Sequence, residues 1–76
     1  MKLRQLRFFV KVVETGNITR AAEQLNVAQT AIGVQIRNLE DDFKVELLER
    51  HSRGVRPTLA GSLLYERAVQ ILRQIE

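Results

Sequence analysis

The sequence predicts a small, mostly α-helical domain in which a three-helix core is followed by a two-stranded hairpin and a final helix. Three observations support this fold class. Apolar residues recur at helical spacing in successive segments before residue 44. A stretch suited to two short strands then surrounds a turn at His51–Gly54. A second helical pattern follows Pro57, so we expect residues 1–58 to form the domain proper and residues 59–76 an additional helix.

The first helix is expected over residues 3–14, because its apolar residues lie three or four positions apart. These residues are Leu3, Leu6, Phe9, Val10 and Val13, with Phe8 and Val12 widening the stripe. Gly16 is a candidate C-cap, since glycine readily adopts the left-handed conformation in which many helices end.

The second helix is expected over about 18–25, with Asn17 or Thr19 as its N-cap. Asn26 suits the following turn, because asparagine tolerates the left-handed region. A third helix then runs to about residue 43. Its apolar positions step by four, three and four residues and predict one buried face: Ile32, Ile36, Leu39 and Phe43.

The other side of the third helix is polar or small, which is typical of a helix that lies in a DNA groove. An α-helix is about 10–12 Å wide and the major groove of B-DNA about 12 Å. In a helix-turn-helix, the first residues of the second helix reach the base edges. Here the candidates are Gln29, Thr30, Gly33 and Val34, with Arg37 one turn further on.

The hairpin predicted within residues 46–57 carries three arginines, and such a basic hairpin beside a helix-turn-helix is called a wing. Arg53 at its tip can enter a narrow minor groove, where the negative potential is enhanced. Arg50 and Arg56 are better placed for phosphates. Pro57 marks the edge or the end of a strand, because it has no N–H to donate.

Thr58 is a strong N-cap candidate for the last helix, expected over residues 59–76. Gly61 begins a seam of small and apolar residues of the kind that paired helices use. The candidate dimerisation residues are Leu64, Ala68, Ile71, Leu72 and Ile75. The same seam can instead pack back on the first helix.

Composition narrows the possible functions. With no cysteine and one histidine, we expect no metal site, no cofactor and no catalytic residues. The acidic run Glu40–Asp42 has no nucleophile or base beside it and is interpreted as a solvated end facing away from DNA. Apolar runs are too short to span a membrane, and the charged N-terminus is unlike a signal peptide, so we expect a cytoplasmic protein.

Together these motifs resemble one known family. The resembling stretches are LRQLRFFVKVVETGNITRAAEQLNVAQTAI, QIRNLE and VELLERHSRGVRPTLAG, which follow essentially the whole chain in order. The chain resembles the N-terminal winged helix-turn-helix domain of the LysR-type transcriptional regulators. Its ending, RGVRPTLAG followed by ILRQ, resembles the nitrogen-assimilation-control branch.

The resemblance implies roles for residues of this sequence. Gln29, Thr30, Gly33 and Val34 would be base-reading residues, Arg53 the minor-groove residue, and helix 59–76 a linker helix pairing antiparallel in a homodimer. Residues 30, 33 and 34 depart from the family's usual Pro, Ser and Arg or other polar residue. A small-molecule effector, and any higher oligomer, would depend on an effector-binding domain that is absent from this chain.

Two functions follow from these observations. The favoured one is sequence-specific binding of double-stranded DNA by a bacterial transcription regulator. The alternative is a winged-helix module for protein–protein interaction, in which the seam and the acidic run would matter more than Arg53. No residue pattern supports an enzyme.

Overall fold

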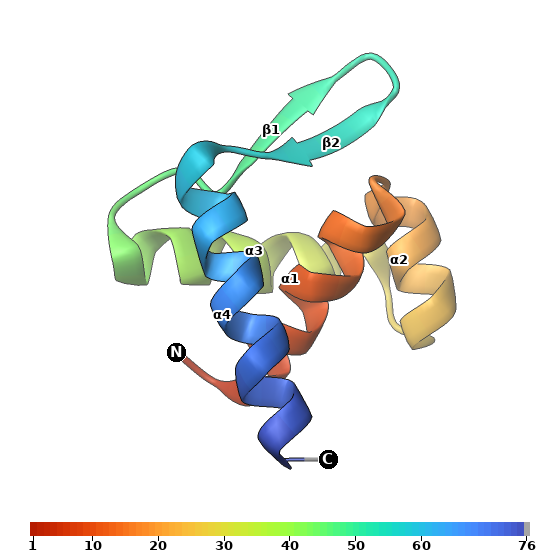
Figure 1. Ribbon diagram of the computed structural model, residues 1–76. Coiled ribbons are helices and arrows are strands. Elements are labelled where there is room, and N and C mark those ends of the chain that lie inside the picture. The colour runs from red at the N-terminus through yellow and green to blue at the C-terminus, as the bar shows by residue number, and fades with distance from the viewer. Residues whose placement is uncertain (76) are drawn as a thin grey trace.

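The computed structural model describes residues 1–75 and contains four helices and one hairpin (Figure 1). In chain order these are α1 (Leu3–Thr15), α2 (Ile18–Leu25), α3 (Gln29–Phe43), β1 (Leu48–His51), β2 (Gly54–Pro57) and α4 (Leu59–Ile75). Helix α1 contacts the other three helices and β2, so it lies at the centre of the fold. The hairpin projects from one end of the molecule (Figure 1). The predicted fold class and element order are confirmed within these residues.

Helix α1 supplies much of the core, but its buried face is turned from the predicted one. Phe8, Phe9 and Val12 are buried together with Leu6, whereas Leu3 is 44% exposed. Val10 and Val13 are only half-buried. The stripe widens toward Phe8 and Val12 because both α2 and α4 pack on this helix in addition to α3. Leu3, the first residue of the predicted apolar stripe, therefore lies outside the core.

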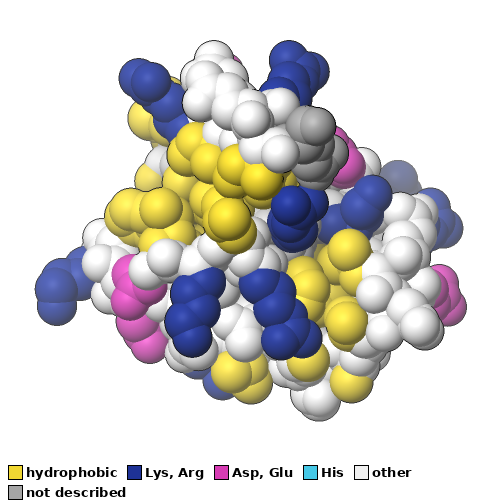
Figure 2. Space-filling view, turned by 90° about the horizontal axis from the view of Figure 1, so that it is seen from below, with side chains coloured by type: hydrophobic (Ala, Val, Ile, Leu, Met, Phe, Trp, Pro, Cys, Tyr) yellow, Lys and Arg dark blue, Asp and Glu magenta, His cyan; other side chains and the backbone are white. Residues whose placement is uncertain are grey.

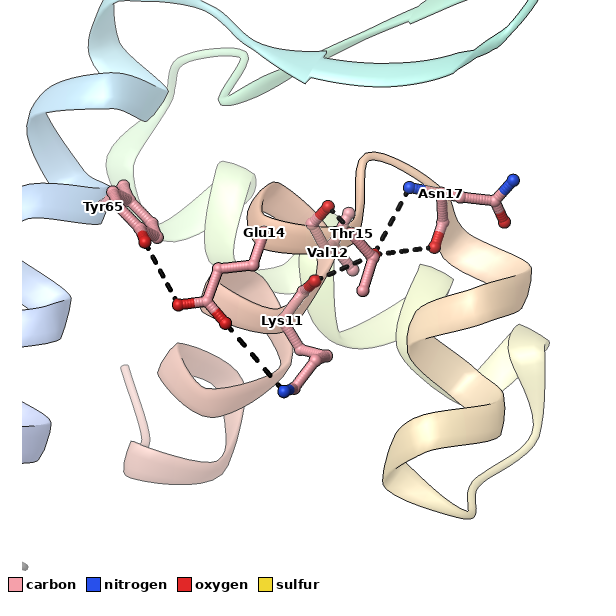
Figure 3. Close-up of polar contacts among 6 residues, drawn as sticks. All are labelled: Lys11, Val12, Glu14, Thr15, Asn17 and Tyr65. Atoms are coloured by element: carbon pink, nitrogen blue, oxygen red, sulfur yellow. Dashed lines mark hydrogen bonds and ion pairs between the residues drawn. The ribbon is translucent and has the colours of Figure 1, made fainter.

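The turns between helices follow the predicted capping chemistry. Gly16 ends α1 in the left-handed conformation, with φ 68°, and its N–H donates to the Val12 carbonyl. The Asn17 side chain accepts a hydrogen bond from the Arg20 N–H at 2.9 Å and so caps α2. The Thr15 hydroxyl also joins this turn, donating to the Lys11 carbonyl at 2.9 Å (Figure 3).

Helix α3 buries three of its four predicted apolar positions. Ile32, Ile36 and Leu39 face the core, but Phe43 is 45% exposed. The prediction for Phe43 was wrong because the helix ends there, where the next residue, Lys44, takes the left-handed conformation with φ 55°.

The hairpin is attached to the helical core through β2. The Val55 N–H donates to the Gly16 carbonyl at 3.0 Å, and the Val55 side chain is buried in the core. A side chain at Gly54 would overlap with the same Gly16 carbonyl, so the close approach needs glycine. Strands β1 and β2 pair antiparallel, with Arg50 opposite Val55 and Glu49 opposite Arg56.

Helix α4 begins with the predicted cap and then packs on α1. The Thr58 hydroxyl accepts from the Gly61 N–H at 3.0 Å, and the Tyr65 hydroxyl donates to Glu14 of α1 at 3.1 Å (Figure 3). Partial desolvation, followed by the nearby Glu14 carboxylate, raises the pKa of Tyr65 above its usual value. The predicted final residue of this helix, residue 76, lies outside the described residues.

The residues of the predicted dimer seam on α4 differ in burial within the single chain. Ala68 is fully buried and Leu72 nearly so within the single chain, on the same side of the helix as Gly61. Ala68 and Leu72 therefore pack back on the domain in the single chain, which is the alternative that the sequence left open for this seam. Leu64 is half-buried, while Ile71 and Ile75 remain exposed along the flank of this buried face.

Candidate nucleic-acid interface

The candidate interface begins with the solvent-facing side of α3. Gln29, Thr30 and Arg37 are exposed there, and Val34 is 49% exposed despite its apolar side chain. A methyl group added at Gly33 would meet nothing within 4 Å. This glycine therefore leaves an open dip in the helix surface, and no neighbour within the domain requires it to be small.

The Gln29 side chain is oriented by the preceding helix. Its amide nitrogen donates to the Thr19 hydroxyl at 2.7 Å, which ties the first turn of α3 to the first turn of α2. The amide oxygen and the second N–H of Gln29 stay available for other partners. From the sequence alone Thr19 is only a candidate N-cap, because a contact between residues ten apart depends on the angle between the two helices.

A shallow hollow lies between the exposed side of α3 and the hairpin. Its lining comes from α2, α3 and β1: Ile18, Gln29, Thr30, Gly33, Val34, Arg37 and Arg50. A second hollow continues from Gln29 and Arg50 to His51, Ser52 and Gly54 in the turn of the hairpin. The structure thus brings the predicted α3 residues and Arg50 together on one surface, and Ile18 is a further member that the sequence analysis did not single out.

The three wing arginines do not share one face. Side chains alternate along a strand and cross-strand partners point the same way. Arg50 therefore lies on the side of its partner Val55, toward the helices, and Arg56 lies on the opposite side with Glu49. Arg53 is exposed in the turn, where its backbone N–H donates to His51 Nδ1 at 3.3 Å. The predicted phosphate contacts of Arg50 and Arg56 would therefore be made from opposite faces of the hairpin.

Acidic residues gather at the other end of α3, away from Gln29. The Asp42 carboxylate lies 3.3 Å from the N-terminal ammonium group. The Glu40 carboxylate is not the simply solvated group that the sequence predicts, because it accepts hydrogen bonds from the backbone N–H groups of Leu47 and Leu48. Helix α3 thus has a polar, partly basic end beside the hairpin turn and an acidic end beside the loop before β1.

A separate apolar surface runs along α4. Leu63 is 59% exposed, Ile71 37% and Ile75 52%. A groove next to Leu63 is lined by residues of α3, α4 and the loop between α3 and β1, including Phe43 and Val45. Figure 2, seen from the side opposite the hairpin, shows hydrophobic side chains gathered on one part of this face with Lys and Arg side chains around them.

Residues 1–75 contain no group of three or more His, Cys, Asp or Glu side chains placed to hold a metal ion. Over the same residues, no helix has both the length and the apolar character to cross a bilayer.

Comparison with known proteins places the chain in a family. Residues 3–62 match the family described as "Bacterial regulatory helix-turn-helix protein, lysR family". The chain belongs to the LysR family. The nitrogen assimilation regulatory protein nac of Klebsiella aerogenes is 50% identical over all 76 residues, and the regulator BenM of Acinetobacter baylyi is 43% identical over the same length. Both relatives are described as regulators.

Solved structures of LysR proteins share this fold. A crystal structure of a CbnR DBD–DNA complex superposes with a TM-score of 0.95 and 44% identity, covering 99% of this chain and 86% of that one. A BenM DBD complex with catB site 1 DNA gives the same TM-score and identity, covering 99% and 83%. The chain spans only about a quarter of the length of the regulators nac and BenM.

Proposed function

We propose that this LysR domain binds double-stranded DNA sequence-specifically, with α3 in the major groove and the hairpin against the adjacent minor groove. One observation carries the proposal: the exposed residues of α3 line a single hollow together with Arg50 of the hairpin. A helix and a basic strand that share one open surface can contact one duplex at the same time. The CbnR and BenM domains of the same fold are described in complexes with DNA, which supports this function.

Base reading is assigned to the first two turns of α3. The Gln29 amide, held by Thr19, can pair with the edge of adenine, and Thr30 can donate, accept or contact a thymine methyl group. Val34 can make only apolar contact, which suits thymine, and Gly33 lets the helix approach closely. This surface carries few charges, so part of the specificity would come from DNA shape.

Charge is supplied beside the reading surface. Arg37 and Arg50 line the hollow, where they can contact phosphates on either side of the groove. Arg53 is exposed in the turn and suits a narrow minor groove, where arginine is favoured. Nine of the twelve basic residues are arginine, the side chain best matched to phosphates and guanine edges.

We further propose a homodimer formed through the exposed flank of α4. Leu64, Ile71 and Ile75 remain at least partly accessible there, and Leu63 extends the same apolar surface. A two-fold dimer would read paired half-sites about one helical turn, or a multiple of it, apart. The relative nac is about four times longer than this chain. In a regulator of that length, an additional domain would bind the small-molecule effector and allow higher oligomers. Such a regulator would act in the cytoplasm.

Fluorescence anisotropy with a promoter-sized duplex tests DNA binding. Affinity should fall as salt rises, with a slope of about 0.9 for each phosphate neutralised. A binding-site selection on the dimer should return paired half-sites. Absence of salt-dependent binding, with dimerisation confirmed in the same sample, would overturn the proposal.

The apolar groove beside Leu63 supports a second candidate, a protein–protein interaction module. The variant Arg53→Ala separates the two functions. Under the DNA-binding proposal it loses DNA affinity and keeps the dimer, whereas a docking module would bind its partner through the groove regardless of Arg53.

A further inference from the structure

The loop between α3 and β1 is held by one carboxylate of α3. Glu40 Oε2 accepts a hydrogen bond from the Leu47 N–H at 2.8 Å and from the Leu48 N–H at 3.3 Å. Hydrogen bonds to an ionised acceptor are stronger than those between neutral groups. The first of these N–H groups belongs to the residue before the hairpin, and the second to the first residue of β1.

The same short segment is fixed on its other sides. The Leu47 side chain is buried in the core, and its carbonyl accepts from the Thr58 N–H at 3.0 Å at the start of α4. The Thr58 hydroxyl donates to the Glu46 carbonyl at 2.7 Å. Both ends of the hairpin thus meet at this segment, and the Glu40 side chain supplies the hydrogen bonds that join Leu47 and Leu48 to α3.

Glu40 also lies next to the proposed DNA-binding surface. It lines a small hollow at the base of the hairpin together with Arg37, Arg50 and Leu48. Arg37 is one helical turn before Glu40 on α3, so the two side chains lie on the same part of that helix. The Glu40 contacts therefore lie where the hairpin meets the side of α3 that carries Arg37.

We infer that Glu40 is a positioning residue that fixes the direction of the hairpin relative to α3, so that the wing arginines and α3 can engage one duplex. The inference rests on the proposed DNA binding for its functional meaning. The structural part of it, that the Glu40 carboxylate orients the hairpin, can be measured without DNA.

The first test measures DNA affinity in a double-mutant cycle of Glu40→Ala and Arg53→Ala. In the unmodified chain, Arg53→Ala should cost roughly tenfold in affinity. If Glu40 positions the hairpin, Arg53→Ala should cost less than about twofold in the Glu40→Ala background. Asp41→Ala is the matched control, because it removes the same charge from the next, exposed residue and should leave the full effect of Arg53→Ala.

The second test uses amide residual dipolar couplings of the free protein. In Glu40→Ala the couplings of residues 48–57 should no longer fit the orientation that fits residues 29–43, whereas Asp41→Ala should leave both sets unchanged. Should Glu40→Ala fail to fold, Glu40→Gln replaces it. The expected change is then smaller, because a neutral acceptor oxygen remains.

The two tests separate the inference from the proposed function. An unchanged hairpin orientation in the Glu40 variants, or a full effect of Arg53→Ala in their background, overturns the inference while DNA binding stands. If the hairpin is displaced but the unmodified chain binds no DNA, the proposed function fails and the orienting role of Glu40 is retained.

Discussion

Two arginines of the hairpin differ in their surroundings although both belong to the same basic segment. Arg50 lines the hollow next to Gln29, and Arg56 lies on the other side of the hairpin opposite Glu49. The difference follows from strand alternation once the register is known. At the scale of single residues, position in the register decides which charges lie on the surface proposed for DNA.

The first prediction compares Arg50→Ala with Arg56→Ala. Each removes one positive charge, so their effects on net charge are equal. Arg50→Ala should lower the slope of affinity against salt by about 0.9, the loss expected for one phosphate contact, while Arg56→Ala should change the slope far less. Anisotropy titrations across a salt series give both values, and equal slopes for the two variants would contradict the assigned faces.

The second prediction concerns the two glycines inside helices. Gly33→Ala should stabilise the domain by about 1 kcal/mol, since alanine is the better helix former and its methyl group meets no neighbour within 4 Å. Gly61→Ala should destabilise it by about 1–3 kcal/mol, because its Cβ would overlap with the Leu47 carbonyl oxygen. Thermal unfolding distinguishes them, and a loss of stability in Gly33→Ala would show that the dip is not open.

At the scale of elements, the residues at which helices begin and end could be predicted from the sequence. Which other element covers the apolar side of each helix could not. Gly16, Asn17 and Thr58 act through bonds to neighbours in the chain, and their local chemistry is visible in the sequence. Ala68 and Phe43 depend on which distant element covers them. Periodicity identifies an apolar side of a helix but does not identify its partner, so the seam of α4 was assigned outward and Phe43 inward.

The candidate site shows the same division. The exposed side of α3 could be predicted because it lies opposite Ile32, Ile36 and Leu39, which is a property of one helix. Two contacts depend on the angle between elements, which no short-range sequence pattern specifies. They are the hydrogen bond between Gln29 and Thr19 and the hydrogen bond from the Leu47 N–H to Glu40. The placement of Ile18 in the hollow belongs to this second group.

The third prediction concerns the flank of α4. Ile71→Asp should weaken the proposed dimer at least about tenfold, because a charge would be buried in the apolar contact. The monomer should keep its fold, since Ile71 is 37% exposed. Gln70→Asp, an equal charge change at an exposed neighbouring position, is the control. Analytical ultracentrifugation measures both, and an unchanged association constant for Ile71→Asp would place the interface elsewhere.

At the scale of the whole molecule, two surfaces lie on different parts of the domain. The polar surface of α3 with the hairpin is proposed for DNA, and the apolar flank of α4 for a second copy. The acidic end of α3 is directed to the loop that supports the hairpin. This separation allows a dimer to form without covering the residues that would read the bases.

The most direct measurement of the central claim is an NMR titration of the domain with a double-stranded oligonucleotide at low salt. Changes in amide chemical shift should concentrate in residues 28–37 and in the hairpin around Arg50 and Arg53. The chemical shifts of the α4 amides beyond Leu64 should stay unchanged. Shifts confined to α4 and the groove beside Phe43, with α3 undisturbed, would contradict the account.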